Sequence, residues 1–152
     1  MSTGAQFKVA AEYHQFYLMD DERQPSIPET VSDEDMARRI RSAPHIVVVH
    51  TASNTRVPVS VEFLSEAPRE DLASWDHVAE FSLELPSGRA VLAGCTDYIP
   101  DCPRIEARPG TYRGRVFSAG LSGAGPEKYR VALWPGKLQA PTVLKQYAEH
   151  AS

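Results

Sequence analysis

The chain has 152 residues, of which 42% are hydrophobic and 24% charged, with a formal net charge of −4 and a pI near 5.7. These values predict one globular domain over 1–152, and the acidic balance argues against direct nucleic-acid binding. No long apolar run and no secretion signal is present, so we predict a cytoplasmic protein without a membrane segment. A short flexible N-terminus is expected over 1–6 and a C-terminal tail over 136–152.

The first predicted element is a strand over Phe7–Met19, which is rich in β-forming residues and has apolar side chains on both faces. The composition then changes sharply. The segment Asp20–Asp35 contains two prolines and many carboxylates, opposed only by Arg23. It therefore has the composition of a surface loop.

A short helix is predicted over Asp33–Ser42, at the end of this acidic segment. Ser32 is a suitable N-cap, and Asp35 follows it at the spacing of a capping box. Met36 and Ile40 are expected to face the core.

The remaining elements are short strands, identified by apolar runs and by alternation of apolar and polar residues. They are predicted over His45–His50, Val57–Phe63, Ala79–Leu85, Arg89–Gly94, Arg104–Ala107, Gly110–Ser118 and Lys128–Pro135. The first two should form one hairpin and the last two another. Pro58 should place its strand at a sheet edge or a bulge. The tail from Gly136 onward holds Leu144, Tyr147 and Ala148 at helix-like spacing, and it is either a docked terminal turn or a frayed end.

This pattern is typical of an all-β, mainly antiparallel fold. We predict a two-sheet β-sandwich of about seven to eight strands with one short helix, and a barrel is the alternative. On the outward face of the last hairpin, three arginines form either a basic recognition patch or, as we expect, a solvated face on which they pair with acidic residues such as Glu80 and Glu84. They are Arg113, Arg115 and Arg130.

No catalytic motif is present, and we predict no catalytic residue, no cofactor and no metal. Cys95 and Cys102 could form a disulfide, half of a metal site or two reduced thiols at the ends of a turn, and a reducing cytosol favours the third. His14 is interpreted as a structural histidine. His77, beside Asp76, is expected in a solvated loop.

Two kinds of binding site are suggested by the residues. The acidic segment is either a solvated loop or a docking surface for a basic protein partner. In the second case the contact residues are Asp20, Asp21, Glu22, Asp33, Glu34 and Asp35. The alternative function is binding of a small ligand or carbohydrate through exposed aromatic side chains, with Trp75, Tyr98 and Trp134 as candidates.

Three short motifs, read in order, resemble those of the competence protein J family. They are the tetrad Tyr13, His14, Gln15 and Phe16, a buried strand leading to Asn54-Thr55, and Gly110-Thr111-Tyr112 at the start of an amphipathic strand. The similarity covers roughly Val9 to Phe117. Members of that family are small bacterial proteins that bind and inhibit a nuclease that acts in DNA uptake. The resemblance thus implies a non-enzymatic inhibitor or immunity protein whose partner is a nuclease or a nuclease-like toxin.

Overall fold

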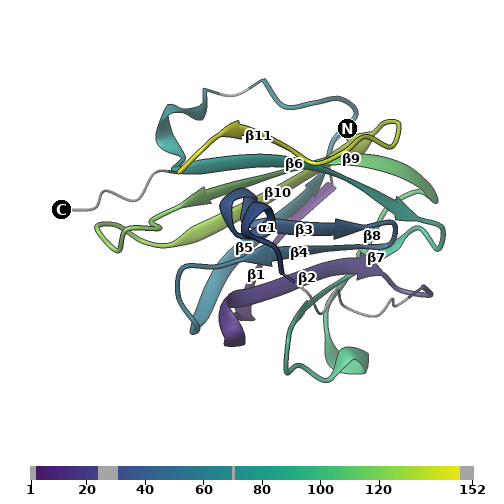
Figure 1. Cartoon of the computed structure of the whole chain (residues 1–152). Helices are drawn as coiled ribbons and strands as arrows, with labels where there is room; N and C mark the ends of the chain where they lie inside the picture. Colours follow the sequence, from purple (N-terminus) through teal and green to yellow (C-terminus); the bar gives the residue numbers. More distant parts are fainter. Residues whose placement is uncertain (1–2, 24–30, 70, 148–152) are drawn as a thin grey trace.

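The computed structural model describes residues 3–23, 31–69 and 71–147 (Figure 1). Its strands are β1 Thr3–Ala10, β2 Gln15–Asp20, β3 Ile40–Ala43, β4 Ile46–His50, β5 Arg56–Phe63, β6 His77–Leu85, β7 Arg89–Gly94, β8 Arg104–Glu106, β9 Gly110–Ala119, β10 Lys128–Pro135 and β11 Thr142–Lys145. The helical elements are α1 Asp33–Arg38 and the 3₁₀ turns η1 Glu12–His14, η2 Leu72–Ser74 and η3 Ile99–Asp101.

The strands form two stacked sheets, which confirms the predicted sandwich (Figure 1). One sheet has six strands in the order β1-β5-β10-β9-β6-β11, and the other has five in the order β3-β4-β2-β7-β8. All pairs are antiparallel except β5 with β10. The number of strands exceeds the prediction, because the sequence did not separate β1 from β2 and did not indicate β3 or β11.

The core lies between the two sheets, where their inward side chains interdigitate. Phe16 of β2 and Tyr129 of β10 meet there edge to face, with ring centroids 5.6 Å apart. A second, smaller apolar cluster covers the outer face of the five-stranded sheet, where Tyr17 and Val48 pack under the loop containing Cys95 and Cys102. β2 and β4 are therefore buried on both faces.

The predicted strand Phe7–Met19 is in fact two strands in different sheets. β1 pairs with β5, and β2 pairs with β4 and β7. Between them η1 turns the chain, with Tyr13 and His14 in the left-handed region at φ 58° and 59°. At this point the end of β1 passes close to the end of β7. A Cβ at Gly94 would lie 2.0 Å from the carbonyl oxygen of Ala10, so this position requires glycine. The predicted flexible N-terminus was also wrong from Thr3 onward, where β1 begins.

The predicted helix exists but is shorter than expected. The capping box of Ser32 and Asp35 is confirmed, and α1 ends at Arg39, which adopts a left-handed conformation at φ 63°. The chain then continues as β3, in which Ile40 is buried as predicted. Met36 does not face the core, because 57% of its surface is exposed.

One predicted hairpin is confirmed and the other is wrong. β9 and β10 pair along their whole length, from Lys128 opposite Ala119 to Pro135 opposite Tyr112. β4 and β5 lie in different sheets. β5 is not an edge strand either, but its pairing with β10 begins at Val59, so Pro58 has a paired neighbour only in β1.

The outer face of the hairpin formed by β9 and β10 carries the predicted arginines. Arg113 and Arg115 donate to the two oxygens of Glu80 on β6, at 2.7 and 2.6 Å, whereas Arg130 pairs with Glu62. Residues after Gly136 cover this region as well, since β11 pairs with β6. The tail is therefore docked rather than frayed over Thr142–Lys145, but as a strand and not as a helical turn, and residues 148–152 lie outside the described part of the chain.

Candidate functional site

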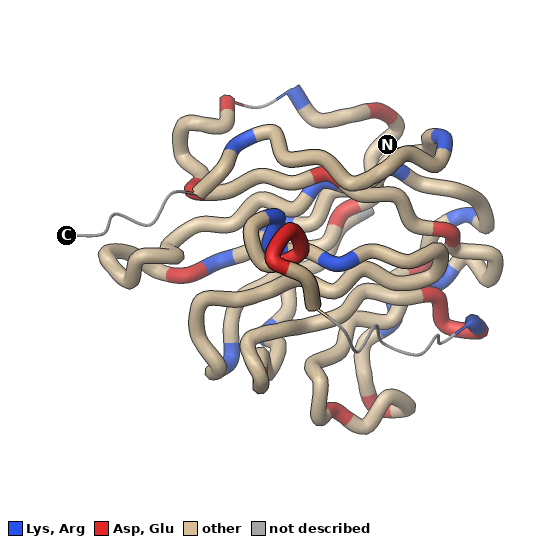
Figure 2. The backbone as a smooth tube through the Cα atoms, viewed as in Figure 1, with Lys and Arg blue, Asp and Glu red and all other residues tan. Residues whose placement is uncertain are grey.

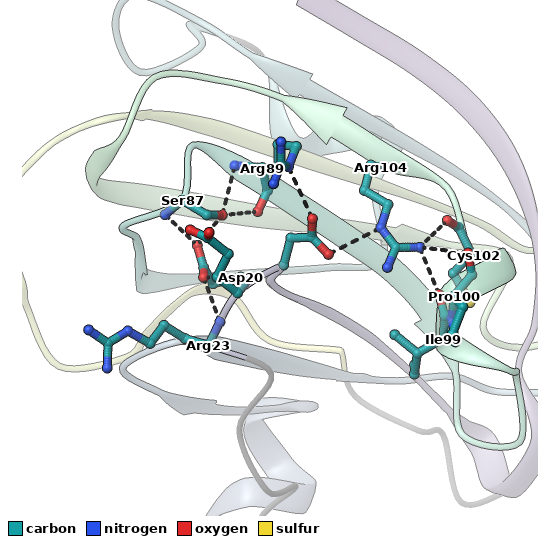
Figure 3. Close-up of polar contacts among 10 residues, drawn as sticks. Asp20, Arg23, Ser87, Arg89, Ile99, Pro100, Cys102 and Arg104 are labelled. Carbon is teal, nitrogen blue, oxygen red and sulfur yellow. Dashed lines mark hydrogen bonds and ion pairs between the residues drawn. The ribbon is translucent and has the colours of Figure 1, made fainter.

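Asp20, the first predicted contact residue, is completely buried at the end of β2. Its carboxylate accepts hydrogen bonds from the backbone N–H groups of Glu22, Arg23 and Ser87 and from the Ser87 hydroxyl, at 2.8 to 3.0 Å (Figure 3). It joins the turn after β2 to the turn between β6 and β7. Asp20 is therefore inaccessible to a protein partner, which the sequence did not indicate.

Asp21 also holds the fold together. Its two carboxylate oxygens pair with Arg89 at 3.0 Å and Arg104 at 3.2 Å. Arg104 in turn donates to the carbonyl oxygens of Ile99 and Cys102, both at 2.7 Å, and so fixes the loop that covers the outer cluster (Figure 3). Of the three acids in this turn, Glu22 is exposed.

The acids of α1 are arranged differently. Asp35 accepts from the backbone N–H of Ser32 and pairs with Arg38 at 3.2 Å. The Ser32 hydrogen bond is the largest cause that lowers the pKa of Asp35. Asp33 is exposed, and the Glu34 side chain is 88% exposed and only 3.8 Å from Arg38. Asp33 and Glu34 therefore present exposed negative charge to the solvent, and the ion pair of Glu34 with Arg38 is long.

The predicted acidic surface is divided into two parts. Asp20 is the last residue of β2, and Asp21 and Glu22 follow it, whereas α1 leads through Arg39 to the other end of the strand, where Gln15 begins β2. These ends are roughly 16 Å apart at the usual rise of a strand. Figure 2 shows the acidic residues of α1 apart from those that follow β2. They cannot act as one continuous patch.

A cleft of about 450 Å³ lies beside α1, at the end of the sandwich where β2 begins and β4 ends. It is lined by Tyr13, His14 and Gln15 of the sequence tetrad, by residues of α1, β3 and β4, and by Leu121 of the long hairpin loop. Phe16, the fourth residue of the tetrad, points into the core. The tetrad thus forms one wall of a surface cleft.

The backbone around the cleft is conformationally unusual. Tyr13, His14 and Arg39 have positive φ values, and among the described non-glycine residues they alone do so. All three line the cleft. A left-handed conformation costs a non-glycine residue on the order of 1 kcal/mol, and such strain is concentrated at functional sites. None of these positions is a glycine or an asparagine, so their left-handed backbone could not be predicted from the residue types.

The floor of the cleft is polar and basic. Arg41, only 6% exposed, donates from Nη2 to Gln15 at 2.6 Å and from Nε to His50 Nε2 at 3.2 Å. Burial, followed by the positive charges of Arg41 and Arg39, lowers the pKa of His50 to about 4. His50 is consequently neutral at pH 7, and because Nε2 accepts, its proton lies on Nδ1.

The rim of the cleft is apolar. We use "rim" for Tyr13, Val31 and Met36, whose surfaces are 73%, 44% and 57% exposed. Exposed large apolar side chains grouped around a cleft are typical of recognition sites. Asp33 and Glu34 belong to the same helix as Met36, so exposed apolar and acidic groups occur together at this end of the molecule.

The aromatic residues of the alternative site do not form a common platform. Trp134 is 9% exposed and lies under Arg115, with 5.3 Å from the guanidinium carbon to the ring centroid. Trp75 packs on Phe117 and Lys128 on the outer face of the six-stranded sheet. Tyr98 is 70% exposed, but it precedes η3 beside the five-stranded sheet.

The remaining titratable residues singled out in the sequence are the two cysteines, His77 and His14. Cys95 and Cys102 are free thiols, and burial raises the pKa of Cys102. The expectation for His77 was wrong: it is 1% exposed, and burial lowers its pKa. His14 is exposed and contacts the carbonyl oxygen of Ala52 at 3.2 Å.

Over the described ranges, no three His, Cys, Asp or Glu side chains are grouped as metal ligands. None of the helices described has the length and apolar composition needed to span a membrane.

Comparison with solved structures gives two matches. ComJ from Bacillus subtilis, described as an inhibitor of the DNA degrading activity of NucA, is 12% identical, with a TM-score of 0.73 over 90% of this chain and 99% of that one. A protein described as crocagin biosynthetic gene J is 20% identical, with a TM-score of 0.68 over the same shares. No protein-family model and no curated protein matches the sequence. The likeness to ComJ confirms the predicted resemblance at the level of the fold, which this chain shares with both proteins.

Proposed function

We propose that this chain is a non-enzymatic binding protein that inhibits a nuclease or a nuclease-like toxin by direct contact. The observation that carries the proposal is the grouping of exposed apolar residues, Tyr13 and Met36, with the exposed acids Asp33 and Glu34 at one end of the sandwich. The shared fold with an inhibitor of DNA degradation supports it.

The acids of α1 would attract the partner. A nuclease carries positive charge where it binds the phosphates of DNA, so a negatively charged inhibitor surface is complementary to that region. Asp33 and Glu34 are suited to this role because they are exposed and weakly paired. Asp20, Asp21 and Asp35 are engaged within the fold, so we place the electrostatic contact on α1.

The rim would supply most of the binding energy. Hot spots of protein interfaces are typically aromatic or apolar anchors surrounded by polar residues. Tyr13 projects from a left-handed turn whose backbone is held by two hydrogen bonds, from His14 N–H to the Ala11 carbonyl oxygen and from Thr51 N–H to the His14 carbonyl oxygen, so little backbone entropy is lost when it is covered. A catalytic role for the cleft is less well supported, because a histidine with a pKa of about 4 is a weak base at neutral pH.

The proposal is tested by DNA degradation. Nuclease captured on the protein from the native cell extract is assayed with and without added protein, with NucA as a second enzyme. We expect DNA degradation to be inhibited in proportion to the fraction of nuclease that is bound. Asp33→Asn with Glu34→Gln should lower the association rate and its salt dependence, whereas Met36→Ala should mainly raise the dissociation rate.

A matched control removes the same charge elsewhere. Glu66 and Glu106 are exposed and lie away from α1, so Glu66→Gln with Glu106→Gln should leave the association rate nearly unchanged. Equal effects of the two double variants would show that only net charge matters. Undiminished DNA degradation by the captured nuclease and by NucA would disprove the inhibitor proposal.

A further inference from the structure

The floor of the cleft has a chemical character different from that of its surroundings. Among the described residues that line the cleft, the charged side chains are those of Arg39 and Arg41, and none of these residues is an aspartate or glutamate. The lowered pKa of His50 agrees with a positive local potential, since both arginines contribute to it after burial. A negatively charged group would therefore be attracted into the cleft, in contrast to the acidic exterior of α1.

Hydrogen-bond donors outnumber acceptors in this floor. Arg39 Nε is buried and has no hydrogen-bond partner among the described residues, although the guanidinium lies over the Tyr147 ring at 5.8 Å. His50 keeps its proton on Nδ1, because Nε2 accepts from Arg41. The backbone N–H of His50 donates to the carbonyl oxygen of Arg39 at 3.0 Å, which places these two residues opposite each other. A buried donor without an acceptor is costly, and an acceptor group on a ligand would remove that cost.

The walls of the cleft are apolar. Tyr13, Val31 and Met36 form the rim, and Leu121 approaches from the hairpin loop. A ligand that suits the cleft thus combines a compact anion with an apolar part. Arg39 and His50 face each other across neighbouring chain segments, so a donor from each suits one oxygen of a carboxylate, and charge-assisted hydrogen bonds of this kind are strong.

We propose that the cleft binds a small carboxylate with an adjoining apolar group, held by Arg39 and His50. This binding does not depend on the nuclease partner. The carboxylate belongs either to a free metabolite or to the C-terminus of a peptide, because both offer the same chemistry.

The two sources are distinguished by matched probes. Benzoate represents a free acid and N-acetyl-phenylalanine a peptide terminus, and the uncharged controls are benzamide and N-acetyl-phenylalaninamide. Binding to the complete chain is followed by NMR of the backbone amides and by the pKa of His50, measured on its ring carbons. We expect saturable binding of at least one acid, with shifts at Gln15, Arg39 and His50 and a raised pKa of His50, because the anion offsets the arginine charge.

Variants test the residues. Arg39→Gln should weaken binding at least about tenfold, whereas Arg56→Gln, which removes an exposed arginine elsewhere, should leave it unchanged. If Arg39→Gln does not fold, Arg39→Lys keeps the charge but removes the planar donor pair, and it should still weaken binding. The pKa of His50, measured with and without the acid in the unaltered protein, tests the site without any variant.

The acid that binds more tightly identifies the source. The proposal is overturned if neither acid binds at millimolar concentration, if the amides bind as well as the acids, if inorganic phosphate binds more tightly than both acids, or if the pKa of His50 does not rise. Unchanged affinity in a folded Arg39 variant would also overturn it.

Discussion

His77 Nε2 lies 2.7 Å from the carbonyl oxygen of Arg38 and donates a hydrogen bond to it, while His77 Nδ1 accepts from the backbone N–H of Tyr147 at 3.0 Å. One buried imidazole thus joins the end of α1, the start of β6 and the C-terminal segment. It fixes the helix whose residues form one side of the cleft.

Replacing His77 should therefore destabilise the whole fold. His77→Phe fills the volume but leaves the Arg38 carbonyl and the Tyr147 N–H without partners, and we expect a loss of about 2 to 4 kcal/mol in the free energy of unfolding, measured with urea. His14→Gln, at an exposed histidine, should change it by less than about 0.5 kcal/mol. Similar values for the two variants would contradict a structural role for His77.

Tyr13→Gly should separate stability from binding. Tyr13 is 73% exposed and strained at φ 58°, so glycine relieves strain and loses little packing. We expect a gain of about 0.5 to 1 kcal/mol in stability, and a higher dissociation rate from the captured partner. Tyr98→Gly is the control, since Tyr98 is equally exposed at 70% but has an ordinary φ of −78°. It should lose stability and keep its affinity, and a destabilised Tyr13→Gly would show that the left-handed turn is not strained.

Stability should fall as the solution is acidified through the histidine range. The pKa of His50 is about 4 and that of His77 is also lowered, so the unfolded chain, with histidine pKa values near 6.5, binds more protons than the folded chain. The stability that these histidines contribute is complete above about pH 6.5 and is lost as the pH falls towards about 4. Arg41 and Arg39 disfavour protonation of His50, and Asp35 favours it only slightly.

Urea unfolding at several pH values checks this dependence. His50→Gln should reduce the slope of the free energy of unfolding against pH between about pH 6.5 and 4, because one of the two histidines with a lowered pKa is removed. The lowered pKa values of Asp35 and Glu127 act at more acidic pH. An unchanged slope in the variant would mean that His50 is protonated in the folded protein as readily as in the unfolded chain.

Asp20→Asn should destabilise the fold far more than the neutralisation of an exposed acid in the same turn. The Asp20 carboxylate accepts four hydrogen bonds, and an amide would present a donor to part of this set of N–H and O–H groups. We expect a loss of about 2 to 4 kcal/mol. Glu22→Gln, two residues later and exposed, should change stability little. If both variants behave alike in thermal unfolding, Asp20 is not the anchor of these turns.

The sequence predicts the features that depend on neighbouring residues. Arg89–Gly94 is found as expected because an apolar run between turns specifies a strand, and the Ser32 cap is found because its partner is three residues away. The turn at Tyr13 was missed because no glycine marks its left-handed backbone, and its hydrogen bond from Thr51 N–H to the His14 carbonyl oxygen comes from a residue that is distant in the sequence. Asp20 was misassigned for a related reason: its partner Ser87 is 67 residues away in sequence. The floor of the cleft likewise depends on pairing between β2, β3 and β4.

Glu80→Gln provides the strongest test of the outer face of the six-stranded sheet. Glu80 is 9% exposed and pairs with both Arg113 and Arg115, so the neutral side chain would leave two largely buried guanidinium groups without their counter-charge. We expect a loss of about 3 to 5 kcal/mol in the free energy of unfolding, measured with urea. Glu34→Gln removes an acid of the same type from a pair that is 3.8 Å long and exposed on the Glu34 side, and it should cost no more than about 0.5 kcal/mol. A small effect at Glu80 would mean that solvent reaches these arginines and that the segment from Gly136 to β11 covers the sheet only loosely.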